Sequence, residues 1–405
     1  MKILIIGMNY FPEPISTGKY TGELVEYLAG QGHQVRVITA PPYYPQWKVS
    51  PEYKGRLYCR EDLRGVRVFR CPLWVPRQPN GLKRLVHLAF FALSSFPVVL
   101  FQAFWRPHWV FCVAPTILNA PGALLAARLC GAKSRLHVQD FELDAALELG
   151  LVSKVPLFSR LAGFFEKRWL SRFDQVSTIS KRMVDKLKEK GVDPGKIFLL
   201  PNWVDTGSIY PLPGVNPLRA ELGIPAAAHV VLYSGNLGFK QGLEVLVEAA
   251  RLLQTSENVL FVICGDGAAR AEIVDHSKGL SNVMFLPVQP LERLNLLLNL
   301  ADVHVLPQKA DVADLVMPSK LGGMLASGKA VIATAFPGTG VAEVVGSVGV
   351  LVDPGDADAL AAAILELVNS PEKRVAFGKK GREFALRNLS SETILDALSD
   401  QLMIL

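Results

Sequence analysis

Residues 301–334 read ADVHVLPQKADVADLVMPSKLGGMLASGKAVIAT, and this is the most informative part of the chain. It predicts a buried strand, a long loop, a helix that opens at Pro318-Ser319-Lys320, and a second buried strand. Ser319 is expected to cap the helix, and Lys320 falls in its first turn beside exposed backbone N–H groups. A lysine is unfavourable at that end of a helix unless an anion offsets it, so the stretch also predicts a phosphate-bearing ligand.

The same alternation of strand and helix patterns runs through the whole chain. One series begins at KILIIGM (2–8) and ends near FLLPNWVD (198–205), and a second begins at HVVLYSGNLG (229–238). The strands are near-continuously apolar, as parallel strands covered on both faces should be. The sequence therefore predicts an α/β protein of two doubly wound Rossmann-like domains. Ligands are expected beyond the carboxyl ends of the strands, in a cleft between the domains.

The chain is predicted to divide into three regions. Its 405 residues exceed one ordinary core, and the proline-rich stretch YPLPGVNP (210–217) separates the two series. We expect an N-terminal domain at 1–208, a C-terminal domain at 209–385 and a final helix at 386–405.

Charge and composition narrow the class of protein. Half of the residues are apolar, which indicates a globular chain. Residues 151–196 hold eleven Lys/Arg against five acids, which suits either an anionic surface or a solvated helix face. No nucleic-acid partner is expected, because no recognised binding module accompanies the charge. The five cysteines lack paired spacing and the N-terminal apolar run is short, so we expect a cytoplasmic protein without disulfides, metal cluster or signal peptide.

A segment of unusual hydrophobicity lies near 82–106. Between Arg84 and Arg106 the sequence is LVHLAFFALSSFPVVLFQAFW, nearly long enough to span a bilayer. A span is disfavoured because the αβ pattern continues on both sides. Two interpretations stay open: a helical hairpin, broken at Pro97, that is either interfacial or buried. The flanking Arg84 and Trp105 resemble interfacial anchors, and the mean hydropathy of +0.26 favours membrane contact.

Two glycine-containing turns follow neighbouring strands of the second series. They are YSGNLGFKQGLEVL and ICGDGAAR, and their candidate residues are Gly235, Asn236, Lys240, Gly265 and Gly267. Glycines let the backbone approach a pyrophosphate, and the lysine adds charge. Neither turn matches a P-loop or a dinucleotide fingerprint. Each turn alone is weak evidence, but together with the helix start described above they indicate one diphosphate-sized site.

Polar side chains also follow a buried strand of the first series, in HVQDFE. His137, Asp140 and Glu142 are placed for proton transfer or hydroxyl binding at the carboxyl end of that strand. His137 could equally be a satisfied core histidine, so Asp140 is the preferred functional member. No metal site is expected, because no second cluster offers complementary ligands.

Two further loops carry candidate residues. Gly18 and Lys19 begin the helix after the first strand, where a glycine is needed by the turn in any case. Gln308 ends a strand, and Asp311 and Asp314 follow it. These acids either hold sugar hydroxyls or are ordinary charges of an exposed loop.

Several long motifs, in order, resemble a known family. LPNWVD, YSGNLGFKQGLE, CGDG and PSKLGGMLASGKAVIA are similar to the family 4 retaining glycosyltransferases of the GT-B fold. GKYTGELVEYLAGQGHQVRVITAPPYYPQW and HVQDFELDA extend the resemblance over essentially the whole chain. The closest resemblance is to members that act in exopolysaccharide (colanic-acid-like) biosynthesis.

The resemblance implies roles for the candidate residues. The C-terminal domain would hold the nucleotide sugar, the N-terminal domain the acceptor, and the last helix would return to the N-terminal domain. The implied catalytic residues are Asp140, Lys240 and Lys320. The implied donor-binding residues are Gly18, Lys19, Gly235, Asn236, Gly265, Gly267, Gln308, Pro318, Ser319 and Leu321. The implied acceptor-binding residues are His137 and Glu142.

The resemblance also implies the substrates, with one departure from the family pattern. GDP-fucose is the expected donor and a polyprenyl-diphosphate-linked saccharide the acceptor, without metal or cofactor, on the inner face of the cytoplasmic membrane. Two glutamates common in the family are replaced here by Leu315 and Gly323, and a basic residue by Asn236. Two alternatives remain: a nucleotide-sugar 2-epimerase of the same fold and a non-catalytic membrane scaffold of polysaccharide assembly.

Overall fold

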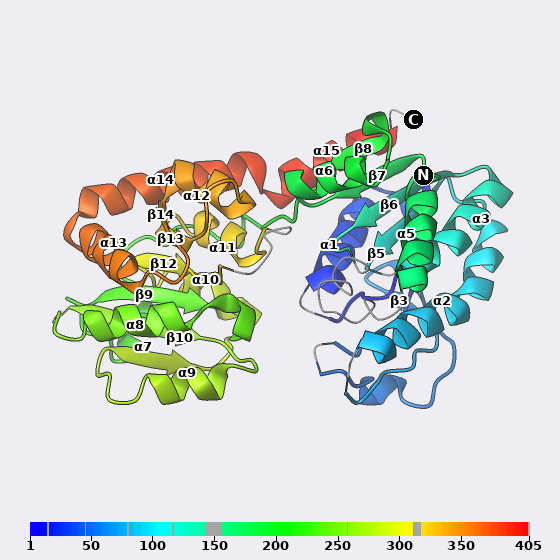
Figure 1. The fold of residues 1–405 in the computed structure, drawn as a ribbon. Coiled ribbons are helices and arrows are strands. Elements are labelled where there is room, and N and C mark those ends of the chain that lie inside the picture. The colour runs from blue at the N-terminus through cyan, green and yellow to red at the C-terminus, as the bar shows by residue number, and fades with distance from the viewer. Residues whose placement is uncertain are drawn as a thin grey trace. The chain divides into compact units, whose positions relative to one another are not determined.

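The computed structural model describes residues 1–13, 16–44, 46–78, 81–115, 117–141, 156–256, 258–310 and 317–403. The chain divides into two compact units (Figure 1). The first unit contains Met1–Pro201 and Gln401–Leu405, and the second contains Asn202–Asp400. The division falls seven residues before the 208/209 boundary expected from the linker.

The first unit is built on an eight-stranded sheet in the order β3-β4-β2-β1-β5-β6-β7-β8. Its strands are β1 (Lys2–Gly7), β2 (Gln34–Thr39), β3 (Cys59–Leu63), β4 (Val66–Arg70), β5 (Trp109–Ala114), β6 (Lys133–Val138), β7 (Gln175–Thr178) and β8 (Ile197–Leu199). Only β3 is antiparallel to its neighbour among these described strands. The strand order reverses between β1 and β5, which is where doubly wound sheets bind ligands.

The second unit repeats this design with a six-stranded parallel sheet in the order β11-β10-β9-β12-β13-β14. Its strands are β9 (His229–Ser234), β10 (Val259–Cys264), β11 (Val283–Leu286), β12 (Val303–Leu306), β13 (Ala330–Thr334) and β14 (Val350–Val352). The order reverses between β9 and β12. The prediction of two doubly wound sheets is confirmed.

Helices cover both faces of the second sheet. One core joins the sheet to α8 (Glu244–Leu252), α9 (Arg270–His276) and α13 (Ala357–Asn369). The other core joins it to α11 (Lys320–Ala326), α12 (Gly340–Val348) and α14 (Pro371–Asn388). Two shorter helices, α7 (Pro217–Glu221) and α10 (Leu294–Leu298), contribute to a third hydrophobic cluster with residues of β9, β10 and β11.

The helices of the first unit are α1 (Ser16–Gly30), α2 (Gly81–Ala103), α3 (Ala120–Cys130), α5 (Pro156–Leu170) and α6 (Lys181–Glu189). The apolar segment forms one continuous helix, α2, so the expected hairpin broken at Pro97 is wrong. Phe91, Ser95, Val99 and Gln102 are buried at helical spacing on both sides of the proline. Packing of this face outweighs the one backbone hydrogen bond that a proline removes.

The C-terminal region differs in detail from the single helix expected at 386–405. Helix α14 ends at Asn388, and a separate helix, α15, runs from Ser391 to Met403. The end of α15 belongs to the first unit, where the indole of Trp109 donates to the Leu402 carbonyl at 3.3 Å.

Candidate functional site

The turns after β9 and β10 are joined backbone to backbone at the carboxyl edge of the second sheet. The Gly235 N–H donates to the Cys264 carbonyl, and the Leu237 N–H donates to the Asp266 carbonyl, both at 2.9 Å. Gly265 has φ +149°, and a Cβ there would lie well under 3.0 Å from the Gly235 carbonyl oxygen. The structure therefore brings together the two glycine turns that the sequence placed at one site.

Lys320 reaches the same edge from the start of α11. Its Nζ donates to the Tyr233 hydroxyl at 2.8 Å and to the Gln241 Oε1 at 2.9 Å, and lies 4.3 Å from the centre of the Tyr233 ring. A Cβ on Gly235 would be 3.4 Å from this amine. Burial lowers the pKa of Lys320 to about 7. The amine thus stands at the strand-order reversal between β9 and β12, where a parallel sheet binds its ligand.

Two expectations for the start of α11 are wrong. Ser319 has helical backbone angles and makes no capping hydrogen bond through its side chain, because a side-chain N-cap needs an extended backbone. Leu321 is fully buried in the core beneath the sheet, so its side chain cannot line a nucleotide. Pro318 is partly buried, and its carbonyl accepts from the Leu321 N–H at 3.0 Å. This segment therefore offers a ligand the Lys320 amine and not a helix terminus capped by Ser319.

The remaining donor candidates lie on the turn after β9 and at the end of β12. Asn236 and Lys240 are exposed, and Lys240 sits in the short 3-10 helix η4 (Phe239–Gln241). The N–H of Gln308 donates to Thr334 Oγ1 at 2.8 Å. A Cβ on Gly267 would be 2.5 Å from the Leu237 carbonyl, so this position also needs glycine. The residue of η4 that contacts Lys320 is Gln241 and not Lys240, and nothing in the sequence indicated it.

Gly18 and Lys19 lie beside a buried carboxylate at the start of α1. A Cβ on Gly18 would be 3.0 Å from the Cβ of Glu13. Glu13 accepts from the backbone N–H groups of Tyr43 and Tyr44, each at 2.9 Å, and burial raises its pKa. The Lys19 amine is 3.7 Å from Glu23. Glu13 therefore links the loop after β1 to the loop after β2. In the sequence, the only sign of this role is that Glu13 is a single acid among apolar and proline residues.

The candidates at the end of β6 separate into a core residue and a surface residue. His137 is buried, with its Nδ1 3.1 Å from Ser177 Oγ, and burial lowers its pKa to about 3. The histidine is therefore a neutral core residue, as the alternative interpretation held, and its expected acceptor contact is wrong. Asp140 is exposed two residues after the strand. Glu142, Asp311 and Asp314 lie outside the described residues.

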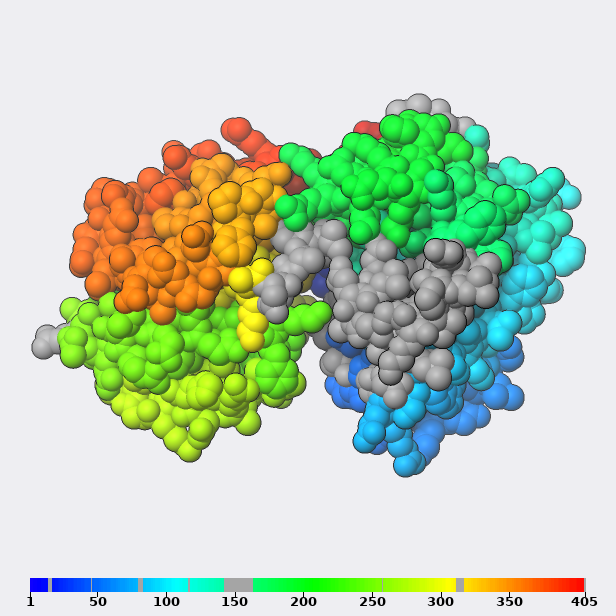
Figure 2. Space-filling view, in the orientation of Figure 1, coloured from blue at the N-terminus to red at the C-terminus, as the bar shows by residue number. Residues whose placement is uncertain are grey.

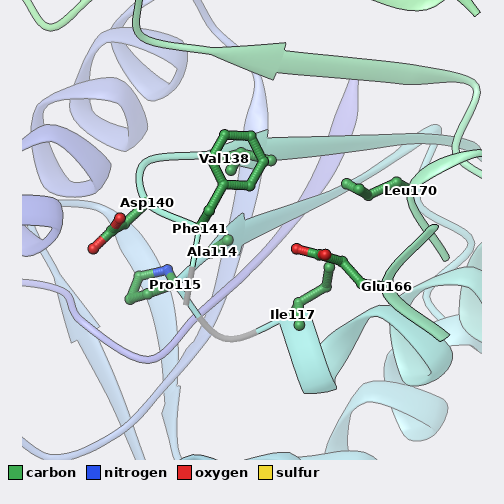
Figure 3. Close-up of a pocket in the computed structure, with 8 residues that line it drawn as sticks. All are labelled: Ala114, Pro115, Ile117, Val138, Asp140, Phe141, Glu166 and Leu170. Carbon is green, nitrogen blue, oxygen red and sulfur yellow. The ribbon is translucent and has the colours of Figure 1, made fainter. Parts of the chain in front are cut away.

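Asp140 borders a small hollow of about 10 Å³ at the carboxyl ends of β5 and β6. Its lining is Ala114, Pro115, Ile117, Val138, Asp140, Phe141, Glu166 and Leu170. Figure 3 shows Asp140 at one side of the hollow and Glu166 at the other. Glu166 is buried and accepts from the Lys190 amine at 2.6 Å. Sequence reasoning missed Glu166 because only the fold brings α5 to these strand ends.

A metal site would need several ligating side chains within reach of one another. Within the part of the chain that the structure describes, His, Cys, Asp and Glu side chains form no group of three that could hold a metal ion.

Comparisons with known proteins agree with this geometry. The chain matches the glycosyl transferase 4-like domain family over residues 17–203 and the glycosyl transferases group 1 family over residues 215–384. It is 44% identical to a glycosyl transferase of Escherichia coli K12, WcaI, named for colanic acid biosynthesis, and the match covers 98% of each chain. The resemblance inferred from the motifs is confirmed.

Solved structures share the fold. Sucrose-phosphate synthase from Thermosynechococcus elongatus superimposes with a TM-score of 0.74 at 21% identity, covering 100% of this chain and 99% of that one. HepE from Anabaena, in complex with UDP, gives a TM-score of 0.72 at 18% identity, covering 100% of both chains. The predicted GT-B fold is confirmed by these neighbours.

Proposed function

Because the chain belongs to the family 4, group 1, glycosyltransferases, we propose that it moves a sugar from a nucleoside diphosphate donor to a lipid-linked saccharide. The observation that carries this proposal is the Lys320 amine at the strand-order reversal of the second sheet, against the Gly235 backbone. The E. coli relative, which is named for colanic acid biosynthesis, supports a role in exopolysaccharide assembly.

The chemistry proposed for this site is charge stabilisation on the leaving group. As the glycosidic bond breaks, negative charge builds on the β-phosphate of the departing nucleotide. A fixed ammonium group in a site that excludes water stabilises that charge strongly. In the retaining mechanism typical of the family, the acceptor hydroxyl attacks from the leaving-group face, and the leaving phosphate takes its proton. Asp140 would orient a sugar hydroxyl and would not act as a strong base.

The nucleotide is open to a direct test. We propose GDP-fucose as donor, and expect GDP to raise the melting temperature more than UDP, ADP or dTDP, because a ligand bound only by the native state stabilises it. Thermal shifts with the four diphosphates at equal concentration measure this. The second step is a transfer assay, in which the sugar of the best-binding nucleotide is transferred to a polyprenyl-diphosphate-linked saccharide. A larger shift with UDP, the ligand of the HepE structure, would reassign the donor.

The same assays separate the two rival functions. An epimerase would change the nucleotide sugar when no acceptor is present. A scaffold would show no shift with any of the four nucleotides and no transfer. Either result would contradict the proposed transferase activity.

The pH dependence of the reaction should follow the protonation of the Lys320 amine. In the unliganded protein its pKa of about 7 means that the amine is charged below that pH and neutral above it. Only the charged form stabilises a departing diphosphate, so kcat/KM for the donor should fall as the pH rises through about 7. Initial rates at low donor concentration, between about pH 5.5 and 9, measure this decline, because that range brackets the pKa of Lys320. Lys320→Arg keeps its charge throughout, and should lose this decline. A decline of the same midpoint in Lys320→Arg would assign the titration to another group.

We also propose that α2 rests on the membrane surface. Its outward row is apolar from Val86 onward and includes Leu93 and Phe101, which are 76% and 68% exposed; Phe104, 85% exposed, follows directly after the helix. Among the described residues this is the one helix apolar and long enough to cross a membrane, yet its other face packs into the first unit. Lying in the interface accounts for both faces. Light-blue atoms of this region lie at the surface in Figure 2.

A neighbouring hairpin and basic residues complete the surface. Leu57 and Tyr58 directly precede the hairpin of β3 and β4. Leu57 is 73% exposed, and the hydroxyl of Tyr58 donates to the Ser94 carbonyl at 3.1 Å, which places this end of the hairpin beside α2. Arg84 and Arg106 flank the apolar row at its two ends. Exposed aromatic and aliphatic side chains flanked by arginines suit an anionic lipid surface.

This surface predicts a specific membrane-release variant. Changing Phe90, Leu93, Phe101 and Phe104 together to serine should abolish sedimentation with vesicles of anionic lipid, because each removes exposed apolar area. Phe91 must be left intact, since it is fully buried and its change would unfold the unit.

A matched control changes four similarly exposed residues of the second unit, Val215, Val288, Leu291 and Val375, to serine. The control should still sediment with the vesicles. Equal loss of binding in both variants, or none in either, would contradict the assignment of the surface to α2.

A further inference from the structure

The Lys320 amine is held by two neutral side chains on two different elements. Tyr233 is the next-to-last residue of β9, and Gln241 is the last residue of η4. Both accept from the amine, at 2.8 and 2.9 Å. A lysine Nζ has three N–H groups when charged, so these two bonds leave one for a ligand. Neither partner is a carboxylate, and among the described residues Lys320 forms no ion pair, which leaves its positive charge for a ligand to neutralise.

The direction of the hydrogen bond between Lys320 and Tyr233 is fixed by a third contact. The Tyr233 hydroxyl donates its one hydrogen to the Asn236 carbonyl at 2.6 Å. Its oxygen can therefore only accept from Lys320. The result is a chain of bonds from the amine, through the phenol, to the backbone of the turn after β9. The position of the amine is thereby coupled to the conformation of the glycine turn.

Gln241 is aimed by the backbone that follows it. Gly242 has φ +65°, and a Cβ there would lie 3.1 Å from the backbone carbon of Gln308. This close approach packs η4 against the loop after β12. Lys240, one residue earlier, is exposed. The turn therefore directs the amide, and not the neighbouring lysine, towards Lys320.

We infer that Tyr233 and Gln241 are positioning residues that hold the Lys320 amine at the site of the leaving diphosphate. The inference rests on the proposed transferase function and assigns separate roles to the three side chains. Lys320 supplies the charge, and its two neutral neighbours restrict a flexible side chain to one orientation before the substrate arrives. Preorganised donors are effective in catalysis because they need no rearrangement as charge develops. Without its two partners, a four-carbon side chain regains its rotamers.

The test is a double-mutant cycle with Lys320→Met. Tyr233→Phe and Gln241→Met keep the size of each side chain and remove the bond to Lys320. Each should lower kcat about tenfold, the effect of one lost hydrogen bond to a charged group, while KM for the donor changes much less. In the Lys320→Met background, Gln241→Met should have no further effect, because it acts only through the amine. Tyr233→Phe also removes the bond to the Asn236 carbonyl, so in that background it should keep only the small part of its effect that passes through the turn.

Several outcomes distinguish this inference from the function on which it rests. A tenfold loss that persists in the Lys320→Met background would show a general structural role and overturn the inference. Normal kcat in Tyr233→Phe and Gln241→Met, with severe loss in Lys320→Met, would overturn the inference alone. Normal transfer by Lys320→Met would overturn both the inference and the phosphate site. Melting temperatures of all variants confirm that each remains folded.

Discussion

Replacing Lys320 with alanine is expected to lower kcat for sugar transfer about 100- to 1,000-fold, the effect of removing one preorganised donor to a developing oxyanion. The amine lies against the Gly235 turn, between the strands where the sheet reverses its order. The fold should survive, because the amine has neutral partners in Tyr233 and Gln241 and its removal leaves no unpaired charge. Initial rates at saturating donor measure the loss, and thermal unfolding checks the fold.

Lys240→Ala is the matched control for this prediction. The sequence gives both lysines the same implied role, but the structure leaves Lys240 exposed on η4 and brings Gln241 to the sheet edge instead. We therefore expect Lys240→Ala to lower kcat less than about tenfold, as the loss of a solvated charge should. The reverse order, with the larger loss in Lys240→Ala, would move the phosphate contact to η4.

The sequence predicted the sheets well because burial on both faces leaves a strong local signature. β1, β5, β9 and β12 are runs of apolar residues that few other elements tolerate. The glycine turns were also readable, because a backbone with positive φ needs glycine, as at Gly265. These properties belong to single residues and their immediate neighbours.

What the sequence could not predict is which way each side chain points. Leu321 and Lys320 are neighbours in the sequence, yet one lies in the core and the other at the ligand edge. His137 lies one residue before the end of β6, but faces inwards to Ser177. Gln241 became visible only when η4 placed it beside a lysine 79 residues away. Such facts depend on packing between distant segments.

The hairpin expected at Pro97 failed for a related reason. Local propensity places a break at a proline inside a helix. The buried spacing of Phe91, Ser95 and Val99 continues through it, and Ser94 Oγ donates to the Pro72 carbonyl at 2.7 Å. Tertiary contacts on one face therefore outweigh the local preference. The same continuity gives the outward apolar row its full length, which a broken hairpin would not have.

Gly265→Ala should be the most destabilising of the changes considered, by about 3–5 kcal/mol, since it combines backbone strain with a clash that neither partner can relieve. The new Cβ would overlap the Gly235 carbonyl oxygen, which is backbone and cannot rotate away. Separation of the two turns would also move Gly235 from Lys320, so nucleotide binding should be lost along with stability.

Gly279→Ala isolates the strain from the clash. Gly279 also has positive φ, +83°, but nothing lies within 4 Å of the position its Cβ would take. It should cost only about 1 kcal/mol, the strain of a left-handed residue. For a unit of this size that lowers the melting temperature by about 2–4 °C, against about 10 °C for Gly265→Ala. Calorimetry of both variants, with and without GDP, measures this. Similar melting temperatures for the two, or a normal GDP shift in Gly265→Ala, would show that the contact between the turns does not shape the phosphate site.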